Sequence, residues 1–185
     1  MTEVEIIQSI KSGNTEAFKT LVEKYQTMVF RTAMGFVHSK EDAEDLTQEI
    51  FVKGFQSIGN FMEKAEFSTW LYRITVNMSL NYVNRKKIER FFDLTNEKTQ
   101  SLFEKQDEAV NPEQRMINNE RDQLIRKAID RLSEKQRTAF VLNKYENLSQ
   151  REIAAIMQIS EGAVEQHLQR AKVNLQKKLS SLVGK

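Results

Sequence analysis

Residues 148–164 read LSQREIAAIMQISEGAV, and this stretch predicts two helices joined by a tight turn. Ser149 and Glu152 have the spacing of a capping box, in which each side chain pairs with a backbone N–H group at the start of a helix. Ile153 is expected to face inward, Ile159 to fill the turn, and Ser160 to cap the next helix. This order of residues indicates a helix-turn-helix motif.

The second helix of the motif carries a polar face that suits the major groove of DNA. A helix fits this groove, where glutamine can bond to adenine and arginine to guanine or phosphate. The candidate reading residues are Glu161, Glu165, Gln166, Gln169, Arg170 and Lys172. The alternative is an ordinary helical hairpin with a solvated face. His167 is expected to be a packed or surface residue, because no second ligand stands at metal-binding spacing.

Helical periodicity extends in both directions from this motif. Apolar residues recur at steps of three and four over residues 16–37. Further helices are expected over about residues 40–55 and from Ser68 to about residue 90. Ser133 and Gln136 have the spacing of another capping box and should open a helix ahead of the motif. The sequence therefore predicts an all-α fold.

A change in composition divides the chain. Residues 91–116 hold more acids than bases, show weak periodicity and contain the only proline, Pro112. We therefore predict two small helical domains, over residues 1–90 and 117–185, joined by a linker over residues 91–116.

Composition also excludes several classes of function. The sequence has no cysteine, so disulfides, thiolate zinc sites and cysteine nucleophiles are excluded. It contains no Walker loop, metal-ligand constellation or nucleophile–base pair, so we expect neither an enzyme nor a cofactor. The net charge is only +2, so binding to nucleic acid must come from local patches. The N-terminus resembles no signal peptide and no stretch could span a membrane, which predicts a cytoplasmic protein without membrane contact.

An acidic stripe lies on the helix predicted over residues 40–55. Its members are Asp42, Asp45 and Glu49, with Gln48 beside them, opposite the apolar face. The helix macrodipole favours acids near a helix start and accounts for Asp42, but Glu49 lies more than a turn later. We therefore predict that this stripe docks a partner.

The next helix combines amides, aromatic residues and bases. Asn77, Asn81 and Asn84 share one face, although asparagine is a mediocre helix former. The bases that follow are Arg85, Lys86, Lys87 and Arg90, which suit phosphates. Interleaved aromatic residues suit unpaired bases, where each stack is worth about 1–3 kcal/mol. The alternative for Phe61, Phe67 and Trp70 is packing in the core.

Two segments in the right order resemble a known family. DAEDLTQEIF at 42–51 and FSTWLYRITVN at 67–77 are similar to region two of extracytoplasmic-function (ECF) sigma factors of the sigma-70 family. LSEKQR at 132–137, with the helix-turn-helix motif, resembles region four. The absence of a region-three domain fits the same group.

The resemblance implies partners and roles. Asp45, Gln48 and Glu49 would bind the clamp coiled coil of the largest subunit of core RNA polymerase, and region four would contact the flap of the second largest. The helix-turn-helix would read the minus-thirty-five element, and the acidic linker would thread toward the active-site channel. An anti-sigma factor is a further expected partner. The residues assigned to minus-ten promoter DNA are Phe61, Met62, Glu63, Lys64, Ala65, Trp70, Arg73, Asn77, Asn81, Asn84, Arg85, Lys86 and Lys87.

Two departures and two alternatives remain open. The base-pocket loop over residues 62–66 and Glu165 both differ from many relatives, so the promoter sequence cannot be inferred. One alternative is a two-domain regulator of the LuxR type that binds duplex DNA without polymerase. The other is a helical adaptor that binds no DNA, which leaves the asparagine face and the basic cluster unexplained.

Overall fold

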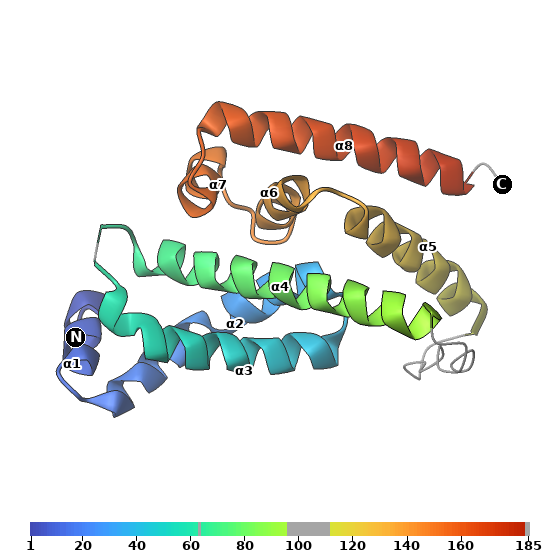
Figure 1. The fold of residues 1–185 in the computed structure, drawn as a ribbon. Coiled ribbons are helices and arrows are strands. Elements are labelled where there is room, and N and C mark those ends of the chain that lie inside the picture. The colour runs from blue at the N-terminus through green and yellow to red at the C-terminus, as the bar shows by residue number, and fades with distance from the viewer. Residues whose placement is uncertain (63, 96–111, 184–185) are drawn as a thin grey trace.

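The computed structural model describes the chain except for residue 63, residues 96–111 and residues 184–185, and every regular element in the described part is a helix (Figure 1). This confirms the predicted all-α fold. The N-terminal half contains α1 (Glu3–Lys11), η1 (Thr15–Ala17), α2 (Phe18–Val37), α3 (Lys40–Ser57), η2 (Ile58–Asn60) and α4 (Phe67–Thr95). The C-terminal half contains α5 (Pro112–Asp130), α6 (Glu134–Lys144), α7 (Gln150–Met157) and α8 (Glu161–Val183).

In the N-terminal half, α2, α3 and α4 pack side by side and α1 closes one end of the bundle (Figure 1). Leu21, Val29, Ile50 and Leu71 meet in the shared core and are almost fully buried. Burial of a side chain of this size stabilises a fold by about 1.5–3 kcal/mol. This core therefore holds α3 and α4 side by side and fixes which of their faces point outward.

The turn between α2 and α3 is set by two residues. His38 follows the last residue of α2 and adopts a left-handed conformation with φ of 59°, which ends the helix. Ser39 is extended, and its hydroxyl oxygen accepts a hydrogen bond from the Asp42 N–H at 3.3 Å, which starts α3. The acidic stripe on α3 therefore begins immediately after a defined corner.

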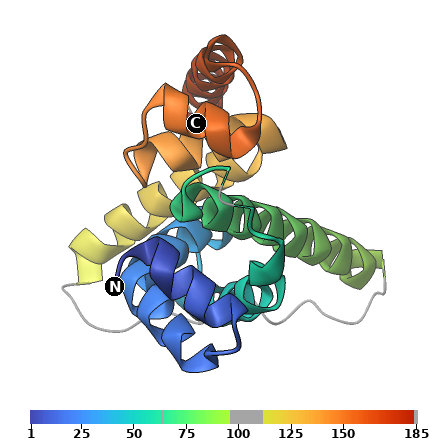
Figure 2. The same ribbon diagram turned by 90° about the vertical axis from the view of Figure 1, so that its left-hand side faces the viewer.

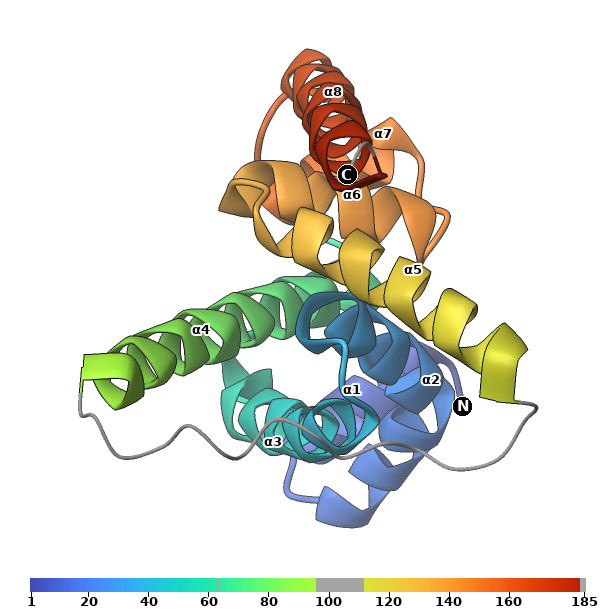
Figure 3. The ribbon, with the colours of Figure 1, turned by 90° about the vertical axis from the view of Figure 1, so that its right-hand side faces the viewer.

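In the C-terminal half, α8 lies across α5, α6 and α7 (Figures 1 and 3). The predicted capping box of Ser149 and Glu152 is confirmed at the start of α7. The predicted helix start at Ser133 is confirmed, because α6 begins at Glu134 with Ser133 as its N-cap residue. The predicted box at this position is wrong, because the Ser133 side chain makes no capping hydrogen bond. Gln136 instead accepts a hydrogen bond from the Asn174 side chain on α8 at 2.9 Å, so a tertiary contact replaces the local one.

The two halves share a second core. Phe36 on α2 and Tyr72 and Val76 on α4 are buried against residues of α6, α7 and α8. Figure 2 shows the helices of the C-terminal half stacked on the N-terminal half. The members from the C-terminal half are Ala139, Val141, Leu142, Ile153, Ala154, Ile156 and Val164. The second core is therefore completed only when the two halves pack together.

Helix ends differ from the sequence-based expectation in three places. α1 was not predicted, and Thr2 and Glu5 start it with a capping box. α4 continues to Thr95 rather than ending near residue 90, and α5 begins at Pro112, where proline's missing N–H is harmless. Most of the predicted linker, residues 96–111, lies outside the described residues. None of the described helices is long and apolar enough to cross a lipid bilayer.

Candidate functional site

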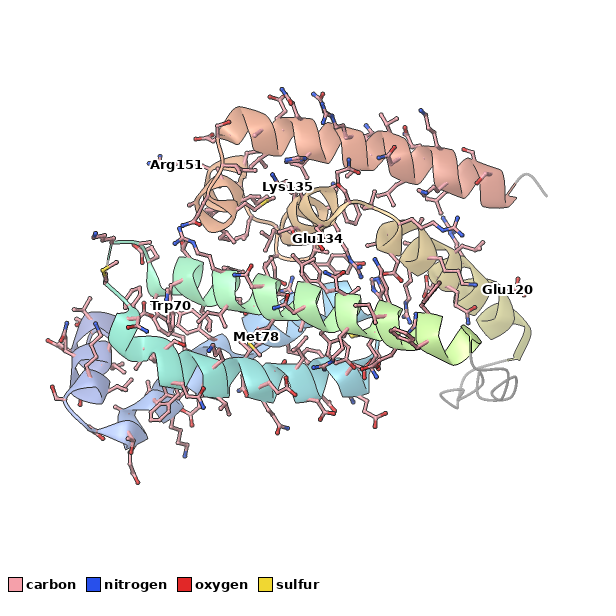
Figure 4. The ribbon with its side chains drawn as sticks, viewed as in Figure 1. Trp70, Met78, Glu120, Glu134, Lys135 and Arg151 are labelled. Atoms are coloured by element: carbon pink, nitrogen blue, oxygen red, sulfur yellow. The ribbon has the colours of Figure 1, made fainter. Side chains whose placement is uncertain are left out.

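The outer face of α3 is acidic and open. Asp45, Gln48 and Glu49 are exposed on consecutive turns, because Leu46 and Ile50 turn the opposite side of the helix into the core. The three side chains line a shallow surface hollow together with Val52, Lys53, Gln56 and Met78. Figure 4 shows Met78 on the side of α4 that faces α3. A partner with a complementary basic and apolar surface can therefore reach this face directly.

Asp42 has a different environment from the other acids of the stripe. Its carboxylate lies beside the Tyr82 hydroxyl on α4, and the side chain is only partly exposed. Burial and this neighbouring negative charge both raise the pKa of Tyr82, so the phenol stays a hydrogen-bond donor. Asp42 therefore helps to join α3 to α4, while Asp45 and Glu49 remain exposed.

Val52 is a member of this face that the sequence reasoning missed. It is 57% exposed, so this apolar residue lies on the surface of α3. Val52 stands seven residues after Asp45 and three after Glu49, so helical spacing places it on the acidic face. That spacing is the signal in the sequence that could have identified Val52.

The segment after η2 presents one exposed methionine above a buried aromatic cluster. Met62 is 71% exposed, Lys64 is exposed, and Glu63 lies outside the described residues. Phe61 is buried, with ring centroids 5.5 Å from Phe67 and 5.4 Å from Trp70. These aromatic rings therefore support the segment from below, and their exposed area is small.

The asparagine face of α4 points toward the C-terminal half. Asn77 and Asn81 are exposed, and Asn84 is partly covered because its side-chain N–H donates to Glu134 Oε1 at 2.8 Å. Arg73, one turn before Asn77, donates to the backbone carbonyl of Ala155 at 2.8 Å. The side chains at the two ends of the asparagine face, Arg73 and Asn84, therefore already have hydrogen-bond partners within the chain.

The basic cluster near the end of α4 is partly neutralised. Arg85 and Lys86 lie 3.8 and 4.0 Å from the Glu89 carboxylate. Both cations also lie over the Tyr82 ring, at 5.4 and 5.6 Å from its centroid. Lys87 is exposed. Because exposed ion pairs of this kind contribute little, a phosphate can replace Glu89 at small cost.

The helix-turn-helix has the predicted construction. Gln158 ends α7 in a left-handed conformation, and Ile159 packs against the second core, which the two halves form together. The Ser160 hydroxyl accepts a hydrogen bond from the Ala163 N–H at 3.2 Å. Val164 is buried and packs α8 into the second core, so the polar face of α8 points outward. The predicted reading residues on α8 are all exposed, namely Glu161, Glu165, Gln166, Gln169, Arg170 and Lys172.

His167 lies beside this face and is partly buried. Burial, together with the positive charges of Lys135 and Arg170, lowers the pKa of His167, so the ring favours its neutral form. Within the described residues, no group of three His, Cys, Asp or Glu side chains could hold a metal ion.

Comparison with known proteins identifies two matching regions. Residues 21–88 match the family model of sigma-70 region 2, and residues 122–175 match that of sigma-70 region 4. RNA polymerase sigma-H factor of Pseudomonas aeruginosa is 34% identical over 97% of this chain and 94% of its own length. ECF RNA polymerase sigma-E factor of Escherichia coli K12 is 31% identical over 99% of this chain and 97% of its own.

Solved structures share the fold. CnrH, in complex with the cytosolic domain of CnrY, matches with a TM-score of 0.64 and 23% identity over 95% of this chain and 96% of its own. The sigma factor RpoE of Bartonella quintana, in complex with the anti-sigma factor NepR, matches with a TM-score of 0.59 and 23% identity over 88% of this chain and 96% of its own. Together with the sequence relatives, these matches show that the chain belongs to the ECF RNA polymerase sigma factor family.

Proposed function

We propose that the chain binds core RNA polymerase through α3, captures the opened minus-ten strand with α4, and reads the minus-thirty-five element with α8. The main support for this proposal is that the adjacent helices α3 and α4 present faces of opposite chemical character. α3 offers Asp45, Gln48 and Glu49, whereas α4 offers amides followed by cations. Carboxylates repel a phosphate backbone, so the two faces suit two different partners.

The docking face on α3 suits the clamp coiled coil of the largest polymerase subunit. Exposed Val52 lies beside the acids, so a partner helix can bury an apolar anchor with salt bridges around it. This pattern of an apolar centre and a charged rim is typical of protein–protein contacts. The flap of the second largest subunit remains the proposed contact of the C-terminal domain.

On α4, capture of an opened strand requires groups that offset the cost of flipping a base, which is a few kcal/mol. Asn77 and Asn81 supply exposed amides, and Lys87 supplies an exposed cation for phosphate. Met62 and Lys64 project from the adjoining segment, where the proposed base pocket lies. On α8, Gln166, Gln169 and Arg170 supply amide and guanidinium donors for duplex DNA.

This function divides the chain into a polymerase-binding and minus-ten domain over residues 1–90 and a minus-thirty-five domain over residues 117–185. The chain acts as an initiation factor without a catalytic step of its own. It works where core polymerase and the chromosome are, in the cytoplasm. An anti-sigma factor is a third proposed partner, since both structural relatives above were solved with a bound protein, in one case named as an anti-sigma factor.

The alternative of a LuxR-type regulator is not favoured, because residues 21–88 match sigma-70 region 2. Run-off transcription separates the two functions. Core polymerase plus this protein should initiate RNA at a discrete set of genomic promoters, whereas core polymerase alone should not. Tight binding of duplex DNA by the free chain, without any new transcript, would contradict the proposal and support a polymerase-independent regulator.

A further inference from the structure

The last turns of α4 carry an exposed apolar patch, formed by Ile88, Phe91 and Phe92. Figures 2 and 3 show this end of the helix projecting past the other helices. Phe91 and Phe92 are 66% and 60% exposed, and Ile88, one turn earlier, is 57% exposed. The two phenylalanines are the most exposed aromatic residues in the part of the chain that the structure describes. An apolar patch of this kind, bounded by polar residues, is typical of a binding surface.

The apolar patch lies in line with the asparagine face of α4. Starting at Asn77, steps of four, three, four and three residues lead through Asn81, Asn84 and Ile88 to Phe91. Residues at this spacing share one face of an α-helix. A rise of about 1.5 Å per residue places Phe91 about 21 Å along the helix axis from Asn77. One continuous stripe therefore passes from amides to an aromatic ring.

Cations flank the apolar patch. Residues 85–92 contain four bases and one acid, a net charge of +3. Lys87 and Arg90 are exposed, and helical spacing puts Arg85 and Lys87 on opposite sides of the stripe. Cations at these positions can bind phosphates on either side of the apolar residues. The end of α4 therefore suits a ligand that combines negative charges with flat, apolar groups.

The two phenylalanine rings meet edge to face. Their centroids lie 6.3 Å apart and their planes are inclined by 77°. This is a common geometry for an aromatic pair, and it holds the two rings together at the surface. Because the rings are not stacked face to face, a flat base can still lie on a ring. Stacking of one base on an aromatic ring raises affinity about fivefold to 150-fold.

Unpaired DNA fits these features better than a duplex, a protein or a membrane does. In a duplex the faces of the bases are covered by their neighbours, so only an opened strand offers them to a ring. A partner helix could cover the apolar patch, but it would give the alignment with the asparagines no role. An anionic bilayer would satisfy the cations and the rings, but amides on the same stripe favour bases over acyl chains.

We propose that Phe91, packed against Phe92, is a stacking site for unpaired DNA bases and extends the strand-capturing face of α4 beyond Asn84. The inference rests on the proposed capture of an opened strand by α4. Both phenylalanines lie beyond residues 21–88, the part of the chain that matches sigma-70 region 2. A strand with a rise of about 3.4 Å per nucleotide would reach from Asn77 to Phe91 with about six nucleotides.

The first test compares two fluorescent single strands of equal length, one of about twelve thymidines and one without bases, so that only the bases differ. Phe91→Ala with Phe92→Ala in the full chain should weaken binding of the thymidine strand about tenfold and leave binding of the abasic strand unchanged. Alanine is a good helix former, so α4 should persist in this variant. Phe55→Ala, which removes an exposed phenylalanine on α3, is the control and should change neither affinity. Equal affinity of the parent chain for the two strands would overturn the stacking site.

Two single substitutions separate stacking from general apolar contact. Phe91→Trp keeps an aromatic plane and should bind the thymidine strand at least as tightly as the parent chain does. Phe91→Leu keeps an apolar side chain without the plane and should lose most of the preference for bases. Lys87→Gln with Arg90→Gln should weaken both strands equally, because both strands carry phosphates. Full binding of the thymidine strand by Phe91→Leu would overturn stacking and make the patch a general apolar contact.

Vesicles of phosphatidylglycerol and phosphatidylethanolamine test the membrane as the alternative ligand. Binding of the parent chain to these vesicles that Phe91→Ala with Phe92→Ala abolishes, without any preference for bases, would overturn the proposal in favour of a lipid surface. Failure of the proposed function would be visible elsewhere, as absence of run-off transcripts from core polymerase with the parent chain. Run-off transcripts together with equal affinity for the two strands would overturn the stacking site alone.

Discussion

The faces of α3 and α4 lie on neighbouring helices but differ in accessibility. The α3 face, with Asp45 and Glu49, is open, whereas the α4 face is bonded to α6 and α7 through Asn84 and Arg73. The α8 reading face is also exposed. Core polymerase can therefore reach the α3 face directly, whereas Arg73 and Asn84 on α4 already have partners in the C-terminal half. The difference predicts that changes on α3 and changes on α4 affect separate steps.

The largest effect is expected on the open face. Asp45→Lys with Glu49→Lys should weaken binding to core polymerase by roughly 100-fold, because like charges at an interface cost several kcal/mol. Binding can be measured by titrating labelled chain with core polymerase. Glu16→Lys with Glu23→Lys is the control with the same change in net charge, since both are exposed acids that do not line this face. Equal losses of polymerase binding in the two variants would show that the loss reflects net charge and not a specific contact of the α3 face.

A smaller loss, confined to a later step, is expected on the α4 face. Asn77→Ala with Asn81→Ala should lower promoter opening about 30-fold, because each lost base contact is worth about 1 kcal/mol at the lower end of the range. Opening is measured by permanganate reactivity of unpaired thymines, and Gln123→Ala on α5 is the exposed-amide control. Polymerase binding should stay unchanged. A parallel loss of polymerase binding would show that the two faces are not independent.

The exposed face of α8 should behave as a third, separate surface. Gln169→Ala should change the base preference in the upstream element by a few-fold, as expected for one amide contact. Selection from a promoter library measures this preference. Gln176→Ala, two turns later on the same helix face, should leave it unchanged. A preference that shifts only with Gln176→Ala would move the reading surface along α8.

The smallest effect is a pH dependence of the packing between the two halves. The Glu146 side chain is 5% exposed, lies 3.4 Å from Arg31 and accepts from the Tyr72 hydroxyl at 3.1 Å. Burial raises the pKa of Glu146 despite the charge of Arg31, so its contribution to this packing is full below the ordinary carboxyl pKa and is lost as pH rises through the raised one. Acidification from neutral pH toward the ordinary carboxyl pKa should therefore slightly raise the melting temperature of the parent chain relative to that of Glu146→Gln, measured by calorimetry.

Glu146→Gln should make this response flat. Asp130 acts with the opposite sign. Burial opposes its ionisation, but the adjacent His38 ring and the Arg137 charge outweigh burial and lower the pKa of Asp130. Its contribution is present above the ordinary carboxyl pKa and is lost only in stronger acid, outside this range. A melting temperature of the parent chain that falls relative to that of Glu146→Gln on acidification would contradict the role given to Glu146.

Local chemistry made much of the molecule predictable. Ser149 with Glu152, and Ser160, act within one turn of chain, so their capping roles follow from spacing alone. The box at Ser133 and Gln136 has the same spacing but was wrong, because Asn174 on a distant helix offers Gln136 a partner. Phe61 was ambiguous for a similar reason, since only tertiary packing with Phe67 and Trp70 decides that its ring is buried.

By itself, the sequence determined the helices, the polar face of each and the family, because these depend on periodicity, capping and motif order over short distances. Only the tertiary structure decided that Asn84 meets Glu134, that Gly35 meets Val141 and that Arg137 closes the end of α2. Each of these contacts joins residues about 50 or more positions apart in the chain. Helical periodicity describes which way a residue faces, but it carries no information on which distant surface will cover that face.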